Sequence, residues 1–414
     1  MSPPNDPAPP RVDPVLTVAR LGRQGDGVAG DVFVPRTLPG EVVTGEIAGD
    51  RMPAPKIVTP SPDRVAPPCP HFRRCGACAV QHASDGFVAA WKIEVVREAL
   101  ARVGLEAEID GIETSRPGTR RRAALAGRKT KKGATIGFHV VRGADIVAIP
   151  ECRVLHPAIL AALPTLEAIT RLAAPRGAEI GLHVTVTESG LDLALGGAKP
   201  LDGSVLAALA PLAAPFARIT WNGEPALQPA VPTIRMGRAA VTPPPGAFLQ
   251  ATAEGEAALV ARCRALLGDA ARVVDLFAGC GTFTFPAAET AAVHALEGDG
   301  ALIAALEEGA RRATGLKPVT AEMRDLFREP LRPEELARFD AAIIDPPRAG
   351  AEAQVRDLAQ ADLARIAFVS CNPTTFARDA AILAQAGWRM GPITVVDQFR
   401  WSAHIELVTS FERS

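Results

Sequence analysis

The 414-residue chain is predicted to be an α/β protein whose C-terminal part contains a doubly wound parallel sheet. Three observations predict this class. From about residue 245, apolar segments of strand length alternate with helical patterns. A glycine-rich turn follows the first of these segments. Before residue 50, short alternating segments with glycine turns indicate a separate small β-barrel.

The composition is that of a globular chain with more than one domain. Hydrophobic residues make up 48% of the sequence and charged residues 22%, and the length exceeds that of a single core. No stretch reaches about 18 uninterrupted apolar residues, so no membrane span is expected. The seven cysteines occur without an export signal, which argues against a disulfide framework. We therefore expect a monomer in the cytoplasm.

Four ranges follow from the patterns along the chain. Residues 1–11 are proline-rich, and we expect a disordered leader. Residues 12–55 are expected to form an OB-type barrel, which either binds nucleic acid or serves as a spacer. Residues 56–235 are expected to mix helices and strands, and residues 236–414 contain the parallel sheet. In the third range we expect a helix through Trp91–Val103 and strands near Ile136–Phe138, Asp145–Ile149 and Ile180–Val186.

A basic run lies in the third range. Residues 120–132 carry seven positive charges, although the formal net charge of the chain is only −1. Such a run is either a contact for a polyanion or a solvated loop. Because tyrosine is absent, stacking on a base would use Phe, Trp, His or Arg.

The glycine-rich motif VVDLFAGCGTFTFP spans residues 273–286. Its Asp275, Gly279 and Gly281 match D-x-F-x-G-x-G, which resembles the first motif of class I S-adenosylmethionine methyltransferases. A dinucleotide fingerprint would need glycine at position 284, where threonine stands. Glu297 ends the next expected strand, where a carboxylate can accept both ribose hydroxyls. The expected strands are Val273–Phe277, Ala292–Glu297, Ala341–Asp345 and Ile366–Ser370, followed by an antiparallel pair, Ile393–Val396 and His404–Phe411.

The motif IIDPPRAG, residues 343–350, places Asp345 at the end of a strand. The two prolines hold the following loop extended. Amino-methyltransferases have an aromatic residue after the prolines, and here Arg348 takes that position. This difference favours a carbon atom as the methyl acceptor.

The motif VSCNP, residues 369–373, brings Cys371 to the same sheet edge. A lone cysteine is most often a small core residue, yet methyl transfer to carbon-5 of a pyrimidine requires a thiolate. Addition of the thiolate to carbon-6 makes carbon-5 nucleophilic. A base must then remove the carbon-5 proton, and Asp397, His404 and Glu406 are the candidates. Alternation would place His404 and Glu406 on one face of the last strand.

Three cysteines, Cys69, Cys75 and Cys78, lie close together in the sequence, and Cys152 is the best fourth ligand. This spacing favours an iron–sulfur cluster. A zinc site and unrelated thiols are the alternatives.

Together these residues resemble the bacterial RNA 5-methyluridine methyltransferases of the iron–sulfur type, which modify large-subunit ribosomal RNA. The resemblance covers nearly the whole chain from Val15 and includes Phe248–Gln250 and the terminal His404-x-Glu406. It implies a TRAM barrel, a central iron–sulfur domain and a class I (Rossmann-like) methyltransferase domain. It also implies S-adenosyl-L-methionine and a [4Fe–4S] cluster as cofactors and RNA as the partner.

The resemblance assigns roles residue by residue. Cys371 would be the nucleophile and Glu406 the proton acceptor. The residues that would contact S-adenosylmethionine are Gln250, Phe277, Thr282, Glu297, Asp325 and Asp345. The cluster ligands would be Cys69, Cys75, Cys78 and Cys152.

The sequence departs from the family pattern at three places. Thr282 replaces a frequent asparagine, Ala251-Thr252 follows Gln250 in place of an apolar residue and asparagine, and residues 399–402 differ from Phe-Pro-x-Thr/Ser. The last change lies at the approach to the base and concerns the RNA site more than the chemistry.

Three other functions are alternatives. A radical enzyme would usually need a CxxxCxxC triad, which is absent. A non-catalytic iron–sulfur RNA-binding protein would not need Cys371 and Glu406. The transfer RNA branch of the family typically lacks the cluster and the barrel, so ribosomal RNA is favoured.

Overall fold

The computed structural model describes residues 13–413, and the predicted leader at 1–11 lies outside them. The chain divides into two compact units, the first comprising Met1–Pro68, Cys78–Trp91 and Trp401–Ala403. The second comprises Cys69–Ala77, Lys92–Arg400 and His404–Ser414. Within residues 13–413, no helix combines the length and the apolar character that a membrane crossing requires.

The first unit contains two three-stranded antiparallel sheets. One has the order β1-β5-β6 and the other β2-β3-β4. Their core is formed by Val18, Ala29, Val34, Val43 and Met52. The strands are β1 (Val15–Thr17), β2 (Arg20–Leu21), β3 (Gly27–Ala29), β4 (Val32–Val34), β5 (Val42–Thr44) and β6 (Lys56–Thr59). The first five lie within the stretch where alternation predicted short strands.

The second unit contains a seven-stranded sheet with the order β10-β9-β8-β11-β12-β13-β14. Its strands are β8 (Arg122–Lys129), β9 (Ala134–His139), β10 (Ile146–Ala148), β11 (Glu179–Thr187), β12 (Gly190–Gly196), β13 (Phe216–Trp221) and β14 (Glu224–Leu227). Helix α2 (Pro157–Ala173) packs on β8, β9 and β11, and α3 (Gly203–Leu209) packs against α2. A short 3₁₀ helix, η1, follows at Ala210–Leu212. The three strands predicted here are found.

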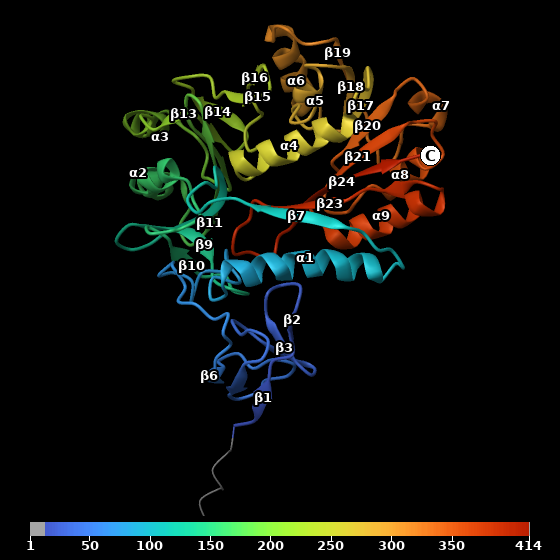
Figure 1. Ribbon diagram of the computed structural model, residues 1–414. Helices are drawn as coiled ribbons and strands as arrows, with labels where there is room; N and C mark the ends of the chain where they lie inside the picture. Colours follow the sequence, from blue (N-terminus) through green and yellow to red (C-terminus); the bar gives the residue numbers. More distant parts are fainter. Residues whose placement is uncertain (1–12, 414) are drawn as a thin grey trace, which may run out of the picture. The chain divides into compact units, whose positions relative to one another are not determined.

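A nine-stranded sheet lies in the same unit, with the path β19-β18-β17-β20-β21-β24-β23-β7 (Figure 1). Strand β22 pairs with β24. Strands β17 to β21 are parallel, and β24 runs antiparallel to β21 and β23. The strands are β7 (Ile109–Thr114), β17 (Arg272–Leu276), β18 (Ala292–Glu297), β19 (Val319–Met323), β20 (Ala341–Ile344), β21 (Arg365–Ser370), β22 (Arg389–Met390), β23 (Ile393–Asp397) and β24 (Glu406–Glu412).

Helices cover both faces of this sheet because its strands are apolar on both sides. Leu259 of α4 packs with Val273 and Val293, whereas Phe376 of α9 packs with Val274 and Phe368 on the other face. The helices are α1 (Asp85–Ala101), α4 (Ala253–Leu267), α5 (Thr284–Ala287), α6 (Gly300–Arg312), α7 (Pro333–Leu336), α8 (Glu352–Leu358) and α9 (Pro373–Gln385). A hairpin, β15 (Ile234–Met236) and β16 (Ala239–Val241), packs beside α6.

The α/β class, the four parallel strands and the final antiparallel pair are therefore as predicted, with one shifted boundary and three missed strands, one of which is the two-residue β22 (Arg389–Met390). Strand β24 begins at Glu406 and not at His404. Strand β19 was missed because it is a partly exposed edge strand with polar residues. Strand β7 was also missed, since Asp110 and Gly111 interrupt its apolar pattern, and it joins the sheet by parallel pairing with β23.

Candidate active site

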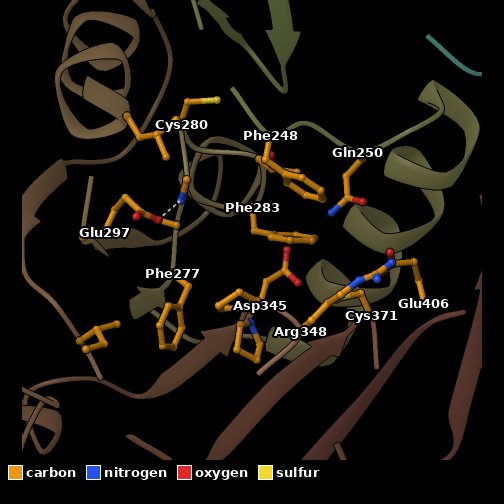
Figure 2. Close-up of a pocket in the computed structure, with 18 of the residues that line it drawn as sticks. Phe248, Gln250, Phe277, Cys280, Phe283, Glu297, Asp345, Arg348, Cys371 and Glu406 are labelled. Carbon is orange, nitrogen blue, oxygen red and sulfur yellow. Dashed lines mark hydrogen bonds between the residues drawn. The ribbon is translucent and has the colours of Figure 1, made fainter. Parts of the chain in front are cut away.

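A cavity of about 590 Å³ opens at the carboxyl edge of the parallel strands. Its volume lies within the range of small-molecule sites. All eight residues predicted to be catalytic or to bind the cofactor line it: Gln250, Phe277, Thr282, Glu297, Asp325, Asp345, Cys371 and Glu406. Figure 2 shows Glu297 toward one end of this cavity and Cys371, Glu406 and Arg348 toward the other.

These residues converge because the strands that precede them end together. Leu276 pairs with Ile344, and Ile344 pairs with Phe368, so the loops after β17, β20 and β21 meet at one edge. Strand β24 runs in the opposite direction, and Ser370 pairs with Leu407. The next residue on each strand is Cys371 or Glu406, which explains how two residues far apart in the sequence become neighbours.

The loop after β17 has a backbone that only some residues adopt easily. Gly279 and Gly281 have φ values of 58° and 106°, and a side chain on Gly281 would collide with the Phe285 ring. Phe277 adopts φ 63° without being glycine, a conformation that costs on the order of 1 kcal/mol. A Cβ added at Gly279 would meet no atom within 4 Å, so a ligand can approach the backbone closely there.

Asp275 lies beneath this loop and is completely buried. Its Oδ2 accepts a hydrogen bond from Thr284 Oγ1 at 2.6 Å, while no described group bonds Oδ1. Burial raises the pKa of Asp275 to about 7. The carboxyl group therefore anchors the loop from below and does not face the cavity.

At the Glu297 end, the carboxylate accepts hydrogen bonds from two backbone amides. Gly279 N lies 3.0 Å from Oε2, as Figure 2 shows, and Asp299 N lies 3.1 Å from Oε1. Phe277 and Phe327 form an aromatic pair here, with ring centroids 5.4 Å apart. Asp325 is exposed beside this pair. This end combines two aromatic rings with two carboxylates, a set suited to a ligand with a flat ring and hydroxyl groups.

At the other end, Cys371, Glu406 and Asp345 line the cavity and are largely shielded from solvent. Burial raises the pKa of Glu406 to about 8, and the nearby Asp345 carboxylate adds to the effect. Desolvation raises the pKa of Asp345 to about 7. Burial, followed by the charges of Glu406 and Asp345, raises the pKa of the Cys371 thiol to about 12. Such shifts are typical of catalytic groups.

Arg348 lies in the same region and opposes these effects. Its charge lowers the pKa of both Cys371 and Glu406. Its guanidinium group donates to His404 Nδ1 at 2.6 Å. Desolvation and the charge of Arg348 lower the pKa of His404 to about 4, so this ring is neutral at pH 7. Asn372 Nδ2 donates to the Arg348 carbonyl at 2.9 Å and holds the loop.

Gln398, which follows β23, was not predicted from the sequence. Its Nε2 donates to Gln250 Oε1 at 2.5 Å, its Oε1 accepts from Ala251 N at 2.7 Å, and it also hydrogen-bonds the Glu406 side chain. Gln398 therefore joins a residue of the predicted cofactor set to the predicted base. A polar residue directly after a buried strand was the available signal.

Of the other candidates for the base, His404 lines the cavity but Asp397 does not. Asp397 is buried in an ion pair with Lys92. Phe248 and Phe399 also line the cavity. The guanidinium of Arg122 lies over the Phe248 ring at 5.0 Å, and that of Arg120 over the Phe399 ring at 5.5 Å.

The basic run is therefore partly internal. Arg121 donates to Glu256 at 2.5 Å and to the Gln250 carbonyl at 3.2 Å, and its side chain is only 13% exposed. It holds the segment after Phe248 and is not available to a polyanion. Lys129, Lys131 and Lys132 are exposed, so the remaining basic surface lies at the end of β8 and in the following loop.

Three of the four predicted cluster cysteines occur in the second unit. Cys75 pairs with Val140 in an isolated bridge, and the backbone N of Glu151 donates to His71 Nε2, so the loops carrying Cys75 and Cys152 are neighbours. Burial raises the pKa of Cys75 and of Cys152, and Cys69 acts electrostatically on both. Cys78 belongs to the first unit. Within residues 13–413, no three side chains of His, Cys, Asp or Glu form a ready metal-binding group.

Comparisons with known proteins identify a family and several relatives. The family model of tRNA (Uracil-5-)-methyltransferase matches residues 318–413. A protein of Brucella suis, described as an uncharacterized RNA methyltransferase, is 46% identical over 399 residues, which are 95% of this chain and 96% of that protein. The 23S rRNA (uracil(1939)-C(5))-methyltransferase RlmD of Pseudomonas fluorescens is 34% identical over 96% of this chain and 94% of its own.

A solved structure shares the fold. The tRNA (uracil-54, C5)-methyltransferase of Pyrococcus abyssi, in complex with S-adenosyl-L-homocysteine, has a TM-score of 0.76 and 23% identity. The match covers 96% of this chain and 99% of that one. The nine-stranded sheet thus belongs to the class I methyltransferase fold.

Proposed function

This chain belongs to the family of RNA (uracil-5) methyltransferases, S-adenosyl-L-methionine-dependent enzymes, and we propose that it acts on large-subunit ribosomal RNA through a covalent adduct of Cys371. The observation that carries the proposal is the position of Cys371 and Glu406 in one cavity with Asp345. The reaction needs a nucleophile and a base on the same ring, and the thiol of Cys371 and the carboxyl group of Glu406 lie at the same sheet edge.

The proposed reaction uses these two side chains in succession. The Cys371 thiolate adds to carbon-6 of the uracil, and the electron pair moves to carbon-5. Bound S-adenosylmethionine supplies the methyl group that carbon-5 attacks. Glu406 then takes the carbon-5 proton, and the electrons of that bond expel the thiolate. Atoms balance: one methyl group replaces one proton on carbon-5, S-adenosylhomocysteine is left from the cofactor, and Cys371 is regenerated as the thiolate.

The surroundings of Cys371 favour the protonated thiol when no ligand is bound. With a pKa near 12, the group is protonated until the local charges change. Two carboxylates raise this pKa and Arg348 lowers it. A positively charged sulfonium centre in the cavity would act in the same direction as Arg348. The nucleophile would then form only when the cavity is occupied.

For the cofactor, we propose that Glu297 and Asp325 bind the adenosine part and that Gln250, Phe277, Thr282 and Asp345 complete the site. Support comes from the open backbone at Gly279 and from the two carboxylates beside the Phe277–Phe327 pair. A ribose diol donates hydrogen bonds, and Glu297 offers two acceptor oxygens for them.

Ribosomal RNA is proposed as the substrate because a relative 34% identical along most of this chain is named for 23S rRNA. Mapping 5-methyluridine in ribosomal and transfer RNA from a deletion strain tests this. Loss of one modification from 23S RNA, restored by the intact gene and not by a Cys371→Ala variant, is the expected result. Loss confined to transfer RNA would overturn the choice of substrate but not the chemistry.

The remaining assignments are proposals about the domains. Residues 12–55 would form a TRAM or OB-type barrel, residues 56–235 an iron–sulfur and RNA-binding region, and residues 236–414 the methyltransferase domain of a cytoplasmic monomer. We also propose that Cys69, Cys75, Cys78 and Cys152 hold a [4Fe–4S] cluster. The sequence spacing and the neighbouring loops of Cys75 and Cys152 support it. No step of the reaction above requires a cluster.

A further inference from the structure

The wall of the cavity beside Glu297 comes from a loop between β19 and α7. Asp325, Leu326 and Phe327 of this loop line the cavity. The loop has no regular secondary structure between Met323, where β19 ends, and Pro333, where α7 begins. Asp325 Oδ1 accepts from Phe327 N at 3.0 Å, and the backbone N of Glu329 donates to the Asp325 carbonyl at 2.7 Å. These local bonds close the turn from Asp325 to Glu329 on itself, but they do not attach it to another element.

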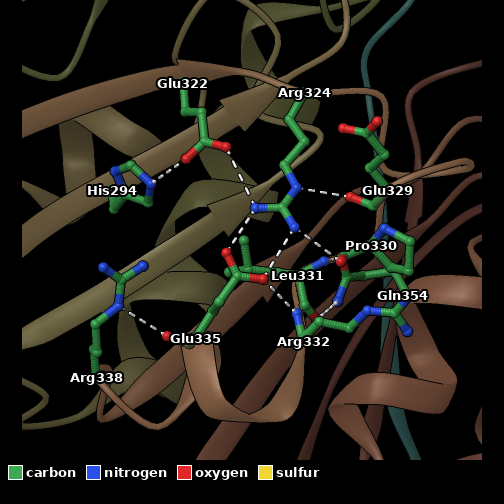
Figure 3. Close-up of polar contacts among 10 residues, drawn as sticks. All are labelled: His294, Glu322, Arg324, Glu329, Pro330, Leu331, Arg332, Glu335, Arg338 and Gln354. Carbon is green, nitrogen blue, oxygen red and sulfur yellow. Dashed lines mark hydrogen bonds and ion pairs between the residues drawn. The ribbon is translucent and has the colours of Figure 1, made fainter.

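Arg324 attaches the far end. Its Nε donates to the Glu329 carbonyl at 2.8 Å, and one terminal nitrogen donates to the Pro330 carbonyl at 3.1 Å (Figure 3). The side chain is 16% exposed, and it does not line the cavity. Arg324 thus joins the two ends of the loop. Its backbone lies at the start of the loop, and its side chain binds carbonyl groups at the end.

A carboxylate holds the guanidinium group in place. Glu335 accepts from both terminal nitrogens of Arg324, at 2.8 and 2.9 Å, which is the two-point geometry that makes arginine–carboxylate pairs strong. Glu335 Oε2 also accepts from Arg332 N at 2.9 Å. Glu322, 3.4 Å away, and the neighbouring His294 complete the network in Figure 3.

The C-terminal end of the loop has a second attachment. Gln354 is completely buried, and its side-chain amide accepts from Leu331 N at 2.8 Å and donates to the Leu331 carbonyl at 3.1 Å. The loop is therefore fixed at Glu329, Pro330 and Leu331. The start of the loop is fixed too, because Arg324 N donates to the carbonyl of Glu297 at 2.9 Å.

We propose that Arg324 is a positioning residue of the S-adenosylmethionine site, which sets the distance between Glu297 and the Asp325–Phe327 wall. This inference rests on the proposed assignment of Asp325 to the cofactor. The backbone of Arg324 is attached to Glu297, its side chain is attached to the far end of the loop, and Phe327 packs on Phe277 between them. A site pre-shaped in this way loses less ordering entropy when the ligand binds.

The test is titration calorimetry with S-adenosylhomocysteine on the full-length protein, together with steady-state kinetics. Arg324→Met keeps most of the side-chain volume but removes all five donors. We expect Kd and the KM for S-adenosylmethionine to rise about tenfold, as for other supporting contacts around a bound group. The KM for RNA and kcat at saturating cofactor should stay within about twofold, because Cys371 and Glu406 lie at the other end. Glu335→Gln, which keeps the shape and weakens the pair, should give the same split and serves if Arg324→Met does not fold.

Arg218 provides a matched control. It also donates to a carboxylate, Asp192, at 2.6 and 2.9 Å and to a carbonyl, Pro243, at 2.7 Å, and it is 10% exposed. Arg218→Met should lower the melting temperature without changing cofactor affinity. If Arg324→Met behaves in this way, the positioning role is wrong. Asp325→Ala tests the cofactor assignment separately from the role of Arg324. If this variant binds S-adenosylhomocysteine with unchanged affinity, the loop does not contact the cofactor and the inference about Arg324 is wrong as well.

Discussion

Lys92 Nζ lies 2.6 Å from Asp397 Oδ1, and neither side chain is more than 1% exposed. The same ammonium group donates to the carbonyl of His404 at 3.0 Å. Desolvation lowers the pKa of Lys92, and the charge of Asp397 opposes this change. Lys92 therefore connects Asp397, the last residue of β23, with His404, which lies two residues before the start of β24. The side chains of His404 and Glu406, which line the cavity, lie at and just after this connection.

Removal of the lysine should destabilise the protein strongly. In Lys92→Met the Asp397 carboxylate remains buried without its partner, a change that typically costs about 3–5 kcal/mol. Urea unfolding at pH 7 measures it. Arg97→Met on the same helix is the control, because its pair with Glu94 is 3.6 Å long and 56% exposed on both sides, and it should cost no more than about 1 kcal/mol.

A double variant adds a second check. Lys92→Met with Asp397→Asn removes both charges, so it should recover part of the loss seen in Lys92→Met alone. Equal stability of Lys92→Met and wild type would contradict this account of the pair. So would a double variant that is no more stable than Lys92→Met.

Glu406 should make the stability of the protein fall as pH rises. Its pKa in the folded protein is about 8, above the ordinary value of 4.5, so folding favours the neutral form. This contribution is complete below about pH 4.5 and is lost as the pH rises through 8. Glu406→Gln is neutral at every pH, so its stability relative to wild type should increase between pH 5 and 9, by about 3–5 kcal/mol.

Urea unfolding of both proteins at several pH values gives the difference directly. Asp275 and Asp345 titrate with the same sign but are present in both proteins. A difference that stays constant with pH, or that decreases, would show that Glu406 is not held neutral. The same shift predicts that wild-type turnover increases from pH 6 to 9, because a base must be ionised to accept a proton.

The cysteines give a prediction that does not depend on activity. If Cys69, Cys75, Cys78 and Cys152 hold a [4Fe–4S] cluster, anaerobically purified protein should be brown and contain about four irons per chain. Cys75→Ser should lose the colour and the iron. Cys263→Ser is the control, since Cys263 is buried in α4 with the core of the nine-stranded sheet. Stoichiometric zinc without iron would contradict the cluster.

The sequence predicts those parts of the fold and the site in which the signal is local. Asp345 and Cys371 each come directly after a buried strand, so the edge on which they lie follows from the strand pattern alone. The bonds of Lys92 to Asp397 and of Gln398 to Gln250 join segments 305 and 148 residues apart. No periodicity marks such partners. Arg121 shows the opposite error: a run of arginines indicated an exposed surface, but Glu256 on α4 supplies a buried partner.

The covalent mechanism predicts different failures for the nucleophile and the base. Cys371→Ala cannot activate the ring, so it should form no adduct with RNA and no product. Glu406→Gln can still add the thiolate and accept the methyl group, but the carbon-5 proton remains. A methylated covalent complex should therefore accumulate in this variant.

Denaturing gels with labelled RNA distinguish these cases. RNA that carries 5-fluorouridine should trap the wild type in the same way, because fluorine cannot leave carbon-5 as a cation. His404→Asn tests the other candidate in the cavity, and it should retain turnover because Arg348 and desolvation keep that ring from acting as the proton acceptor. An adduct with Cys371→Ala, or none with wild type on fluorinated RNA, would overturn covalent catalysis. Normal turnover by Glu406→Gln would move the base to His404, since Asp397 is held by Lys92 away from the cavity.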